Sequence, residues 1–193
     1  MSYIQFINTD TGFAFHKNYT FITTDQGLTW DTLGDPKNKQ GGYGCFINYS
    51  TGYRLYGGDV YYTSNSGANW SVNDLNIYAT IRINFANENT GYILAENNRI
   101  MRTTNAGINW QDITSQTGNG TATAKLLSSC FLDQNTGFVV GWVGTMLKTT
   151  NGGNNWNNVN NPSETRHVID VDFINHTTGY CIRSSSWLGD LLK

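Results

Sequence analysis

The sequence is short of the features by which several classes of protein are recognised. Its 193 residues include only 2 Pro, and 12 Lys and Arg stand against 14 Asp and Glu, for a formal net charge of −2. Because the basic residues are scattered and outnumbered, the composition excludes a basic nucleic-acid binder. No apolar run approaches the roughly 20 residues that span a bilayer, so no membrane span is expected.

Cysteine is also scarce. The three residues, Cys45, Cys130 and Cys181, are an odd number without metal-ligand spacing, which predicts neither a disulfide framework nor a zinc site. Cys45 and Cys130 each precede a phenylalanine of the repeat described below, and we interpret them as small, buried strand residues. The opening Met-Ser-Tyr-Ile-Gln-Phe lacks the basic start and apolar stretch of a secretory signal.

The sequence is rich in turn formers and aromatic residues instead. It has 21 Gly, 25 Asn and 24 Thr, and aromatic residues make up 13% of it. This aromatic content is too high for a disordered chain, although only 13% of the residues are charged. Such a composition is typical of many short strands joined by tight turns.

An internal repeat accounts for nearly the whole chain. Its first part, the lead unit, reads Phe-x-[Asn/Asp]-x-x-Thr-Gly-[Phe/Tyr] and begins at Phe6, Phe46, Phe85, Phe131 and Phe173. The intervals between these phenylalanines are 40, 39, 46 and 42 residues. A period of about 40 residues is the length of one four-stranded propeller blade.

The second part of the repeat, the clip, reads Thr-x-[Asp/Asn]-x-Gly-x-x-Trp. Its copies are Thr23-Asp25-Gly27-Trp30, Thr63-Asn65-Gly67-Trp70, Thr103-Asn105-Gly107-Trp110 and Thr149-Asn151-Gly153-Trp156. The Asp or Asn can accept backbone N–H groups two or so residues ahead, and the Gly permits a positive φ. The Trp then begins the next strand, where its apolar face packs on a neighbouring unit. We therefore interpret the clip as a structural turn between two strands.

Between these units the apolar residues alternate as they do in short strands, and no helical periodicity of useful length is present. Each repeat is expected to form four strands, which predicts an all-β propeller of four-stranded antiparallel blades. The predicted blades are residues 1–40, 41–79, 80–125, 126–167 and an incomplete 168–193.

The clips resemble Asp-box (BNR) repeats, and the combined unit resembles the propeller family of photosystem II assembly factors and their bacterial relatives. The resemblance covers essentially the whole chain. It implies a β-propeller, but it says less about function, because this fold carries many activities. Three of the four clips have Asn where the family usually has Asp.

The repeat is not a whole number of blades, since there are five lead units and four clips. Residues 189–193 align with 144–148, so the sequence printed ends one residue before a fifth clip. We considered a fragment of a larger propeller of roughly six to eight blades, a short product completed by a second copy or closing as five, and an open arc held by a partner. We expect the 193-residue chain to self-associate through its incomplete blade or to need a partner, because an unpaired strand edge is exposed.

Catalytic patterns are not found. The chain lacks the [Phe/Tyr]-Arg-Ile-Pro element of sialidases, and Tyr53-Arg54-Leu55-Tyr56 is the nearest approach. Asp170 and Asp172 share one side of a strand, and we expect a surface or channel-facing pair rather than the two carboxylates of a glycosidase. His16, His167 and His176 lack metal spacing, and no Gly-rich loop is followed by Lys-Ser or Lys-Thr. The sequence therefore predicts a protein that is not an enzyme and has no cofactor or metal.

Binding is the better hypothesis. The loops opposite the clips vary in length and content, and two tryptophans fall outside the clips. We predict a rim patch made of these and nearby residues: Trp142, Trp187, Tyr19, Tyr43, Tyr56, Tyr78, Arg166 and His167. Exposed aromatic side chains on a rigid rim suit a protein contact or sugar stacking, whereas the alternative for both tryptophans is packing between blades.

We therefore predict a non-catalytic scaffold that binds a protein partner, as part of a larger bacterial surface, secreted or particle-associated protein. The alternative is a glycan-binding propeller or a truncated glycoside hydrolase of the sialidase or xyloglucanase type. An extracellular or cell-surface location is favoured.

Overall fold

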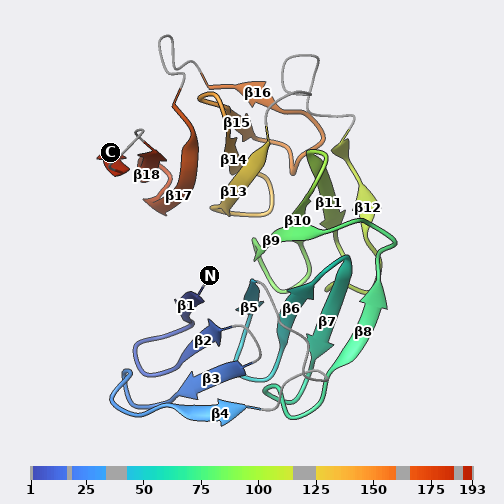
Figure 1. The fold of residues 1–193 in the computed structure, drawn as a ribbon, viewed down its shortest axis with the longest axis vertical. Coiled ribbons are helices and arrows are strands. Elements are labelled where there is room, and N and C mark those ends of the chain that lie inside the picture. The colour runs from blue at the N-terminus through green and yellow to red at the C-terminus, as the bar shows by residue number, and fades with distance from the viewer. Residues whose placement is uncertain are drawn as a thin grey trace. The chain divides into compact units, whose positions relative to one another are not determined.

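The computed structural model describes residues 2–16, 19–33, 43–114, 125–159, 166–184 and 189–192, the last group and residue 2 by their backbone only. In these ranges the regular elements are nineteen β-strands, β1 to β19, arranged in five sheets (Figure 1). By length and hydropathy, no helix within the described ranges qualifies as a membrane span. The chain divides into two compact units, residues 1–83 and 84–193.

Unit 1 holds the first two sheets. Their strands follow chain order, β1-β2-β3-β4 and β5-β6-β7-β8, and all pairs are antiparallel. The strands are β1 (Ser2–Phe6), β2 (Gly12–His16), β3 (Tyr19–Thr23), β4 (Asp31–Leu33), β5 (Gly44–Phe46), β6 (Gly52–Tyr56), β7 (Asp59–Thr63) and β8 (Ser71–Asp74).

The third sheet has the order β12-β11-β10-β9, and the boundary between the units falls within its first strand, after Ile83. Its strands are β9 (Thr80–Phe85), β10 (Gly91–Ala95), β11 (Arg99–Thr103) and β12 (Gln111–Asp112). The fourth consists of β13 (Leu126–Phe131), β14 (Gly137–Gly141), β15 (Met146–Thr149) and β16 (Asn157–Asn158). The fifth has three strands, β17 (Val168–Asn175), β18 (Thr178–Ser184) and β19 (Gly189–Leu192).

Each sheet falls inside one of the five blade ranges proposed from the repeat, so we number the blades 1 to 5. The fold class expected from the sequence is confirmed in its strand content: the first four sheets have four strands each, and the described part of the fifth has three. The missing position is that of the strand which, in blades 1 to 4, follows the clip.

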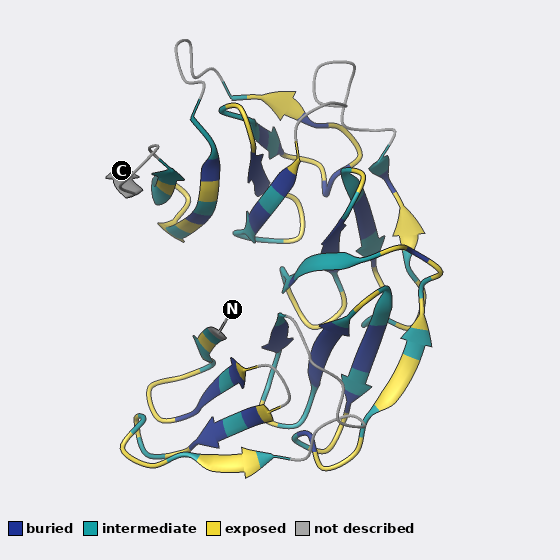
Figure 2. Cartoon of the chain, viewed as in Figure 1, coloured by how far each residue is buried: buried dark blue, intermediate teal, exposed yellow. Residues whose placement is uncertain are grey.

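In blades 1 to 4 the core lies mainly on the middle strands, whereas in blade 5 the buried residues are on β17. All five residues of β10 and of β14 are buried, whereas the outer strands β4, β8, β12 and β16 are mainly exposed (Figure 2). Continuous apolar segments such as Tyr92-Ile93-Leu94 are typical of strands covered on both faces. The outer strands are short and polar, which suits an edge in contact with water.

The four clips share one set of hydrogen bonds. In the last clip the Thr149 hydroxyl donates to Asn151 Oδ1 (3.1 Å) and accepts from the Gly153 N–H (2.8 Å), while Asn151 Oδ1 accepts from the Asn155 N–H (2.9 Å). The glycine has φ = +81°, and the residue before it, Gly152, has φ = +68°. In the other clips this preceding position holds Gln26, Ser66 and Ala106, all with positive φ, a requirement that the sequence pattern did not reveal.

The packing of the lead unit accounts for the glycine that all five of its copies contain. In blade 2, Asn48 Oδ1 accepts the N–H groups of Ser50 and Thr51 (3.0 and 2.8 Å), which closes a turn before β6. A Cβ placed on Gly52 would lie 2.6 Å from the Phe46 ring, so only glycine lets that ring lie flat on the strand. The same ring meets Trp70 edge to face, with centroids 6.3 Å apart. The two motifs of a repeat therefore pack on each other within one blade.

Candidate functional site

The candidate site lies on the hairpin that joins β14 to β15 in unit 2. Trp142, Val143, Gly144 and Thr145 form its turn, in which the Thr145 N–H and hydroxyl both donate to the Trp142 carbonyl (3.0 and 2.7 Å). Val143 and Gly144 both have positive φ, 53° and 66°. Positive φ at both central positions defines a type I′ turn, which suits the twist of a hairpin.

Val143 is an unusual residue for this conformation. A β-branched side chain at positive φ is strained, by about 1 kcal/mol or more, and such strain persists only where the surroundings impose it. In the equivalent turn of blade 3 the central residues are Asn97 and Asn98, each with φ = 59° and each better suited to it. The sequence analysis did not predict this strain. A Val-Gly pair at the centre of a hairpin is a signal by which such a strained turn could have been found.

The segment that enters β17 holds this turn in place. The Val143 N–H donates to Nδ1 of His167 (3.1 Å), and the Gly144 N–H donates to the carbonyl of Arg166 (2.9 Å). Because Nδ1 accepts this bond, neutral His167 carries its proton on Nε2. On the other side, the Trp142 N–H donates to the Lys125 carbonyl (2.8 Å). The turn is thus fastened at three consecutive backbone N–H groups.

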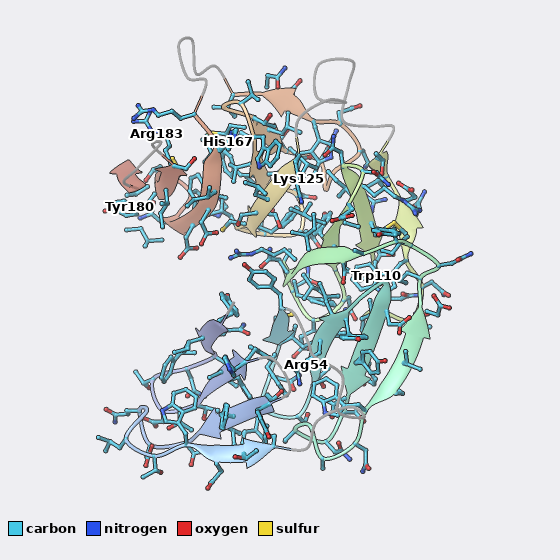
Figure 3. All side chains as sticks on the ribbon, in the orientation of Figure 1. Arg54, Trp110, Lys125, His167, Tyr180 and Arg183 are labelled. Carbon is cyan, nitrogen blue, oxygen red and sulfur yellow. The ribbon has the colours of Figure 1, made fainter. Side chains whose placement is uncertain are left out.

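Trp142 and His167 together form an aromatic surface, which we call the Trp142 platform. The two rings are nearly parallel, at 8°, with centroids 4.9 Å apart. Trp142 nevertheless remains 44% exposed. His167 thus covers part of the indole, while the rest faces solvent. Figure 3 labels His167 and Lys125 on this part of unit 2.

The eight residues predicted for a rim patch divide between the units. Trp142, Arg166 and His167 come together in unit 2, as described above. Trp187 lies outside the described residues. The four tyrosines belong to unit 1: Tyr19, Tyr43, Tyr56 and Tyr78. A patch shared by all eight stays a prediction.

In unit 1 the tyrosines have different surroundings. Tyr43 packs edge to face on Tyr3 (6.1 Å between centroids), and the Arg82 guanidinium lies over both rings, 5.3 and 5.5 Å from their centroids. Tyr78 is exposed and Tyr56 is half-buried. Tyr19 is exposed and tilted against Phe21, 6.1 Å away. Tyr43 therefore belongs to a cation–π cluster with Tyr3 and Arg82, a grouping that sequence spacing alone did not suggest.

The carboxylates considered for catalysis have partners in the neighbouring blade. The Ser128 hydroxyl donates to Asp170 Oδ1 (2.6 Å), and the Cys130 thiol lies 3.6 Å from Asp172 Oδ1. Each of these carboxylates also accepts the N–H of the residue that follows it. These contacts give the pair a role in joining blades 4 and 5. No cluster of His, Cys, Asp and Glu able to hold a metal occurs within the described ranges.

The Arg and Cys residues singled out from the sequence are structural as well. Arg54 is fully buried on β6 (Figure 3), which is unlike a substrate-binding arginine open to a cleft. Cys45 is buried, and desolvation raises the pKa of its thiol to about 12, so it is protonated at neutral pH. Cys130 and Cys181 are half-buried free thiols, so the expectation that Cys130 is buried was wrong: its thiol lies at the contact with Asp172 of the next blade.

Comparison with known proteins agrees with this architecture. Residues 62–165 match the family model described as photosynthesis system II assembly factor YCF48. A structure of YCF48 bound to D1 peptide is 14% identical over 94% of this chain and 89% of that one, with a TM-score of 0.50. YCF48 from Cyanidioschyzon merolae is 11% identical over 92% and 78%, with a TM-score of 0.56.

A propeller enzyme is similar in fold too. An ancestral GH74 enzyme is 14% identical and superposes with a TM-score of 0.74, covering 100% of this chain but only 30% of its own. No curated protein matches the chain. At these identities the solved structures show the fold alone, and they confirm the β-propeller expected from the repeats. Since the family model covers more than half of the sequence, the chain belongs to the YCF48 family of BNR-repeat propellers.

Proposed function

We propose that this chain is a non-catalytic protein-binding propeller and that its partner contacts the exposed face of Trp142. The observation that carries the proposal is the Trp142 platform, where an indole that is 44% exposed is held parallel to His167. A tryptophan left this exposed adds little to the blade core, and tryptophan is among the residues most enriched at the centres of protein interfaces.

Rigidity is the second argument. Trp142, Val143 and Gly144 each donate a backbone hydrogen bond to a neighbouring segment, and His167 fixes the plane of the indole. An aromatic side chain fixed before binding loses little conformational entropy when a partner docks, which raises affinity. The strain at Val143 fits a turn whose conformation serves the position of Trp142.

The relatives support the class of partner. A structure similar to this chain is that of YCF48 bound to D1 peptide, so a propeller of this family accepts a peptide ligand. Asp170 and Asp172 contact Ser128 and Cys130 of the neighbouring blade, and this structural role favours binding over glycoside hydrolysis. The larger bacterial surface, secreted or particle-associated protein predicted from the sequence stays a prediction.

The test uses a displayed library of random peptides. Peptides retained by the wild-type chain should lose at least about tenfold in affinity for Trp142→Ala, corresponding to about 1.4 kcal/mol. The matched control is Tyr49→Ala, which removes an aromatic ring that is 55% exposed in unit 1 and lies outside the predicted rim patch. Peptides that bind the wild type and Trp142→Ala equally would contradict the proposal.

Glycan binding is the second candidate, because a flat exposed indole also suits stacking on a sugar ring. A glycan array separates the two. Sugar binding that is lost in Trp142→Ala, together with no enriched peptide, would favour the glycan over the protein partner. Trp187→Ala belongs in both assays, since this residue completes the patch predicted from the sequence.

A further inference from the structure

The fourth clip contains a pair of residues that is chemically labile. Asn151 is followed by Gly152, and within the described residues no other asparagine precedes a glycine. In such a pair the glycine nitrogen can attack Cγ of the asparagine, because the glycine has no side chain to block the approach. In the second and third clips the asparagine precedes Ser66 and Ala106 instead. Of the three clips with an asparagine, the fourth therefore has the amide that is chemically easiest to lose.

Loss of this amide changes the chain in a defined way. The Gly152 nitrogen gives up its proton to water and bonds to Cγ of Asn151, and the side-chain amide nitrogen takes up a proton and leaves as ammonia. Water then opens the resulting five-membered imide at one of its two carbonyls. Cleavage of the new bond to Cγ gives aspartate, whereas cleavage at the original backbone carbonyl gives isoaspartate, in which the main chain runs through Cγ. Water is the only co-reactant.

The closed clip blocks the first step of this reaction. The Gly152 N–H donates to the Asn135 carbonyl (2.8 Å), and Gly152 is buried, so its nitrogen is not available for attack. Asn151 Oδ1 is fixed as well, because it accepts from the Thr149 hydroxyl (3.1 Å) and the Asn155 N–H (2.9 Å). The imide can form only after both groups have left these partners. The amide is thus protected while the clip stays on the turn of the lead unit.

The protecting hydrogen bond recurs in every clip. The residue that follows the Asp or Asn donates its N–H to the carbonyl of the fifth residue of the lead unit in the same blade, at 3.0, 2.8, 2.9 and 2.8 Å in blades 1 to 4. The donors are Gln26, Ser66, Ala106 and Gly152, and the acceptors are Asp10, Ser50, Asn89 and Asn135. In blade 4 a second bond, from Nη1 of Arg102 to the Gly152 carbonyl (2.6 Å), holds the same residue. Opening of the fourth clip therefore breaks contacts both within blade 4 and with blade 3.

We propose that Asn151 is a modification site at which deamidation records the opening of the clip in blade 4. While the clip is closed, the amide persists. When the clip separates from the turn of the lead unit, the Gly152 nitrogen reaches Cγ and the imide forms. Local opening of this kind occurs in native proteins at free energies below that of global unfolding. The fraction of modified chains therefore measures how long the clip has been open.

The two products affect the clip differently. Aspartate keeps the side-chain oxygen that accepts from Thr149 and Asn155, as the carboxylate of Asp25 does from the equivalent donors in the first clip. Isoaspartate lengthens the main chain between Thr149 and Gly153, so the Thr149 hydroxyl no longer meets both the side-chain oxygen and the Gly153 N–H. Formation of isoaspartate therefore leaves the clip without its shared hydrogen bonds.

Peptide mapping by mass spectrometry tests the proposal, with the folded chain and the chain in guanidinium chloride kept at one pH and temperature. Asn151 is expected to deamidate at least about tenfold more slowly in the folded chain, because only the open fraction reacts. In the unfolded chain it should react faster than Asn105, the matched control in the third clip. Equal rates at Asn151 in the folded and unfolded chains, or equal rates at Asn151 and Asn105 in the unfolded chain, would overturn the proposal.

A variant that loosens the clip makes the test specific. Thr149→Val removes the hydroxyl that joins Asn151 to Gly153, and should raise the rate at Asn151 in the folded chain by about tenfold. Thr145→Val, in the hairpin of the same blade, is the control and should leave this rate unchanged. Matching circular dichroism spectra establish that both variants are folded. Equal rates in the two variants would contradict a protecting role for the clip.

The products are separated by an isoaspartate methyltransferase, which labels only isoaspartate. Chains enriched in isoaspartate at this position should melt at a lower temperature than the wild type. Asn151→Asp, which has only the other product, should melt no lower than the wild type. An Asn151→Asp variant that melts as low as the isoaspartate chains would show that loss of the amide, and not the altered main chain, disrupts the clip.

Discussion

The clips and the hairpins opposite to them differ in how much sequence they share. Four clips repeat the same hydrogen bonds, with the glycine N–H donating to the Thr hydroxyl at 2.8 or 2.9 Å in each. Among the hairpin turns that the structure describes, no residue pattern is shared: the turn is formed by Gly57 and Gly58 in blade 2, by Asn97 and Asn98 in blade 3, and by Val143 and Gly144 in blade 4. The clips maintain the blade, so their chemistry is constrained, whereas the hairpins are free to differ and can carry a binding surface.

If the clips maintain the blade, removing a clip hydroxyl should destabilise the protein more than removing a hairpin hydroxyl. Thr149→Val keeps the shape of a fully buried residue but leaves the Gly153 N–H without its acceptor, and should lower the free energy of unfolding by about 2 kcal/mol. In the hairpin, Thr145→Val removes one exposed hydrogen bond to the Trp142 carbonyl and should cost less than about 1 kcal/mol.

Urea unfolding of both variants measures the difference. Equal losses would mean that the repeated hydrogen bonds are not what stabilises the clips. A change in the denaturant slope would indicate instead that one variant alters the unfolded or native ensemble.

A second variant examines the hairpin alone. Val143→Asn replaces a β-branched residue at φ = +53° with a residue that adopts this conformation more readily, and should raise the free energy of unfolding by about 1 kcal/mol. Asn97→Val, at the equivalent position of the blade 3 turn, is the reverse change at φ = 59° and should lower it by a similar amount. Thermal unfolding reports both, and a destabilised Val143→Asn would show that the valine side chain has a packing role that outweighs its strain.

The smallest effect concerns the one clip that carries a carboxylate. Hydrogen bonds from the Thr29 hydroxyl, the Thr29 N–H and the Thr23 hydroxyl lower the pKa of Asp25 to about 2. Since the folded pKa lies below that of the unfolded chain, this contribution to stability is complete above about pH 4 and is lost as the pH falls towards 2.

Asp25→Asn should therefore differ from the wild type most at neutral pH and least near pH 2. The reciprocal change, Asn65→Asp, should introduce a smaller acid sensitivity of the same sign into the second clip, because Asn69 stands there in place of the threonine whose hydroxyl bond lowers the Asp25 pKa most. Unfolding curves from neutral to acid pH measure both variants. A gap between the wild type and Asp25→Asn that widens as the pH falls would contradict the assignment.

Much of the blade could be predicted from the sequence because its interactions are local. Thr149, Asn151 and Gly153 lie within five residues of one another, so their spacing alone predicts a turn that closes on itself. The same holds for Asn48, Thr51 and Gly52 in the lead unit. Alternating apolar residues then predict the strands, and a period of about 40 residues predicts the blade.

The arrangement of the residues in the predicted rim patch could not be predicted in this way, because it depends on contacts between residues that are distant in the sequence. The sequence included Trp142 and His167, but nothing in their spacing of 25 residues predicts that one ring stacks on the other. Nor did it predict that Tyr43 would lie with Tyr3 and Arg82. Such contacts depend on the curvature of strands and the path of loops, which local pattern does not specify.

The sequence by itself therefore determined the repeating blade, its clips and its family, because hydrogen bonds and hydrophobic periodicity within about 40 residues are sufficient to specify them. The tertiary structure alone decided which side chains are covered by the neighbouring blade. Phe46 and Phe6 occupy the same position of the repeat, yet one is 1% exposed and the other 46%, because only Phe46 is covered by the preceding blade. Burial at a repeated position is a property of the neighbours, and only folding brings the neighbours into place.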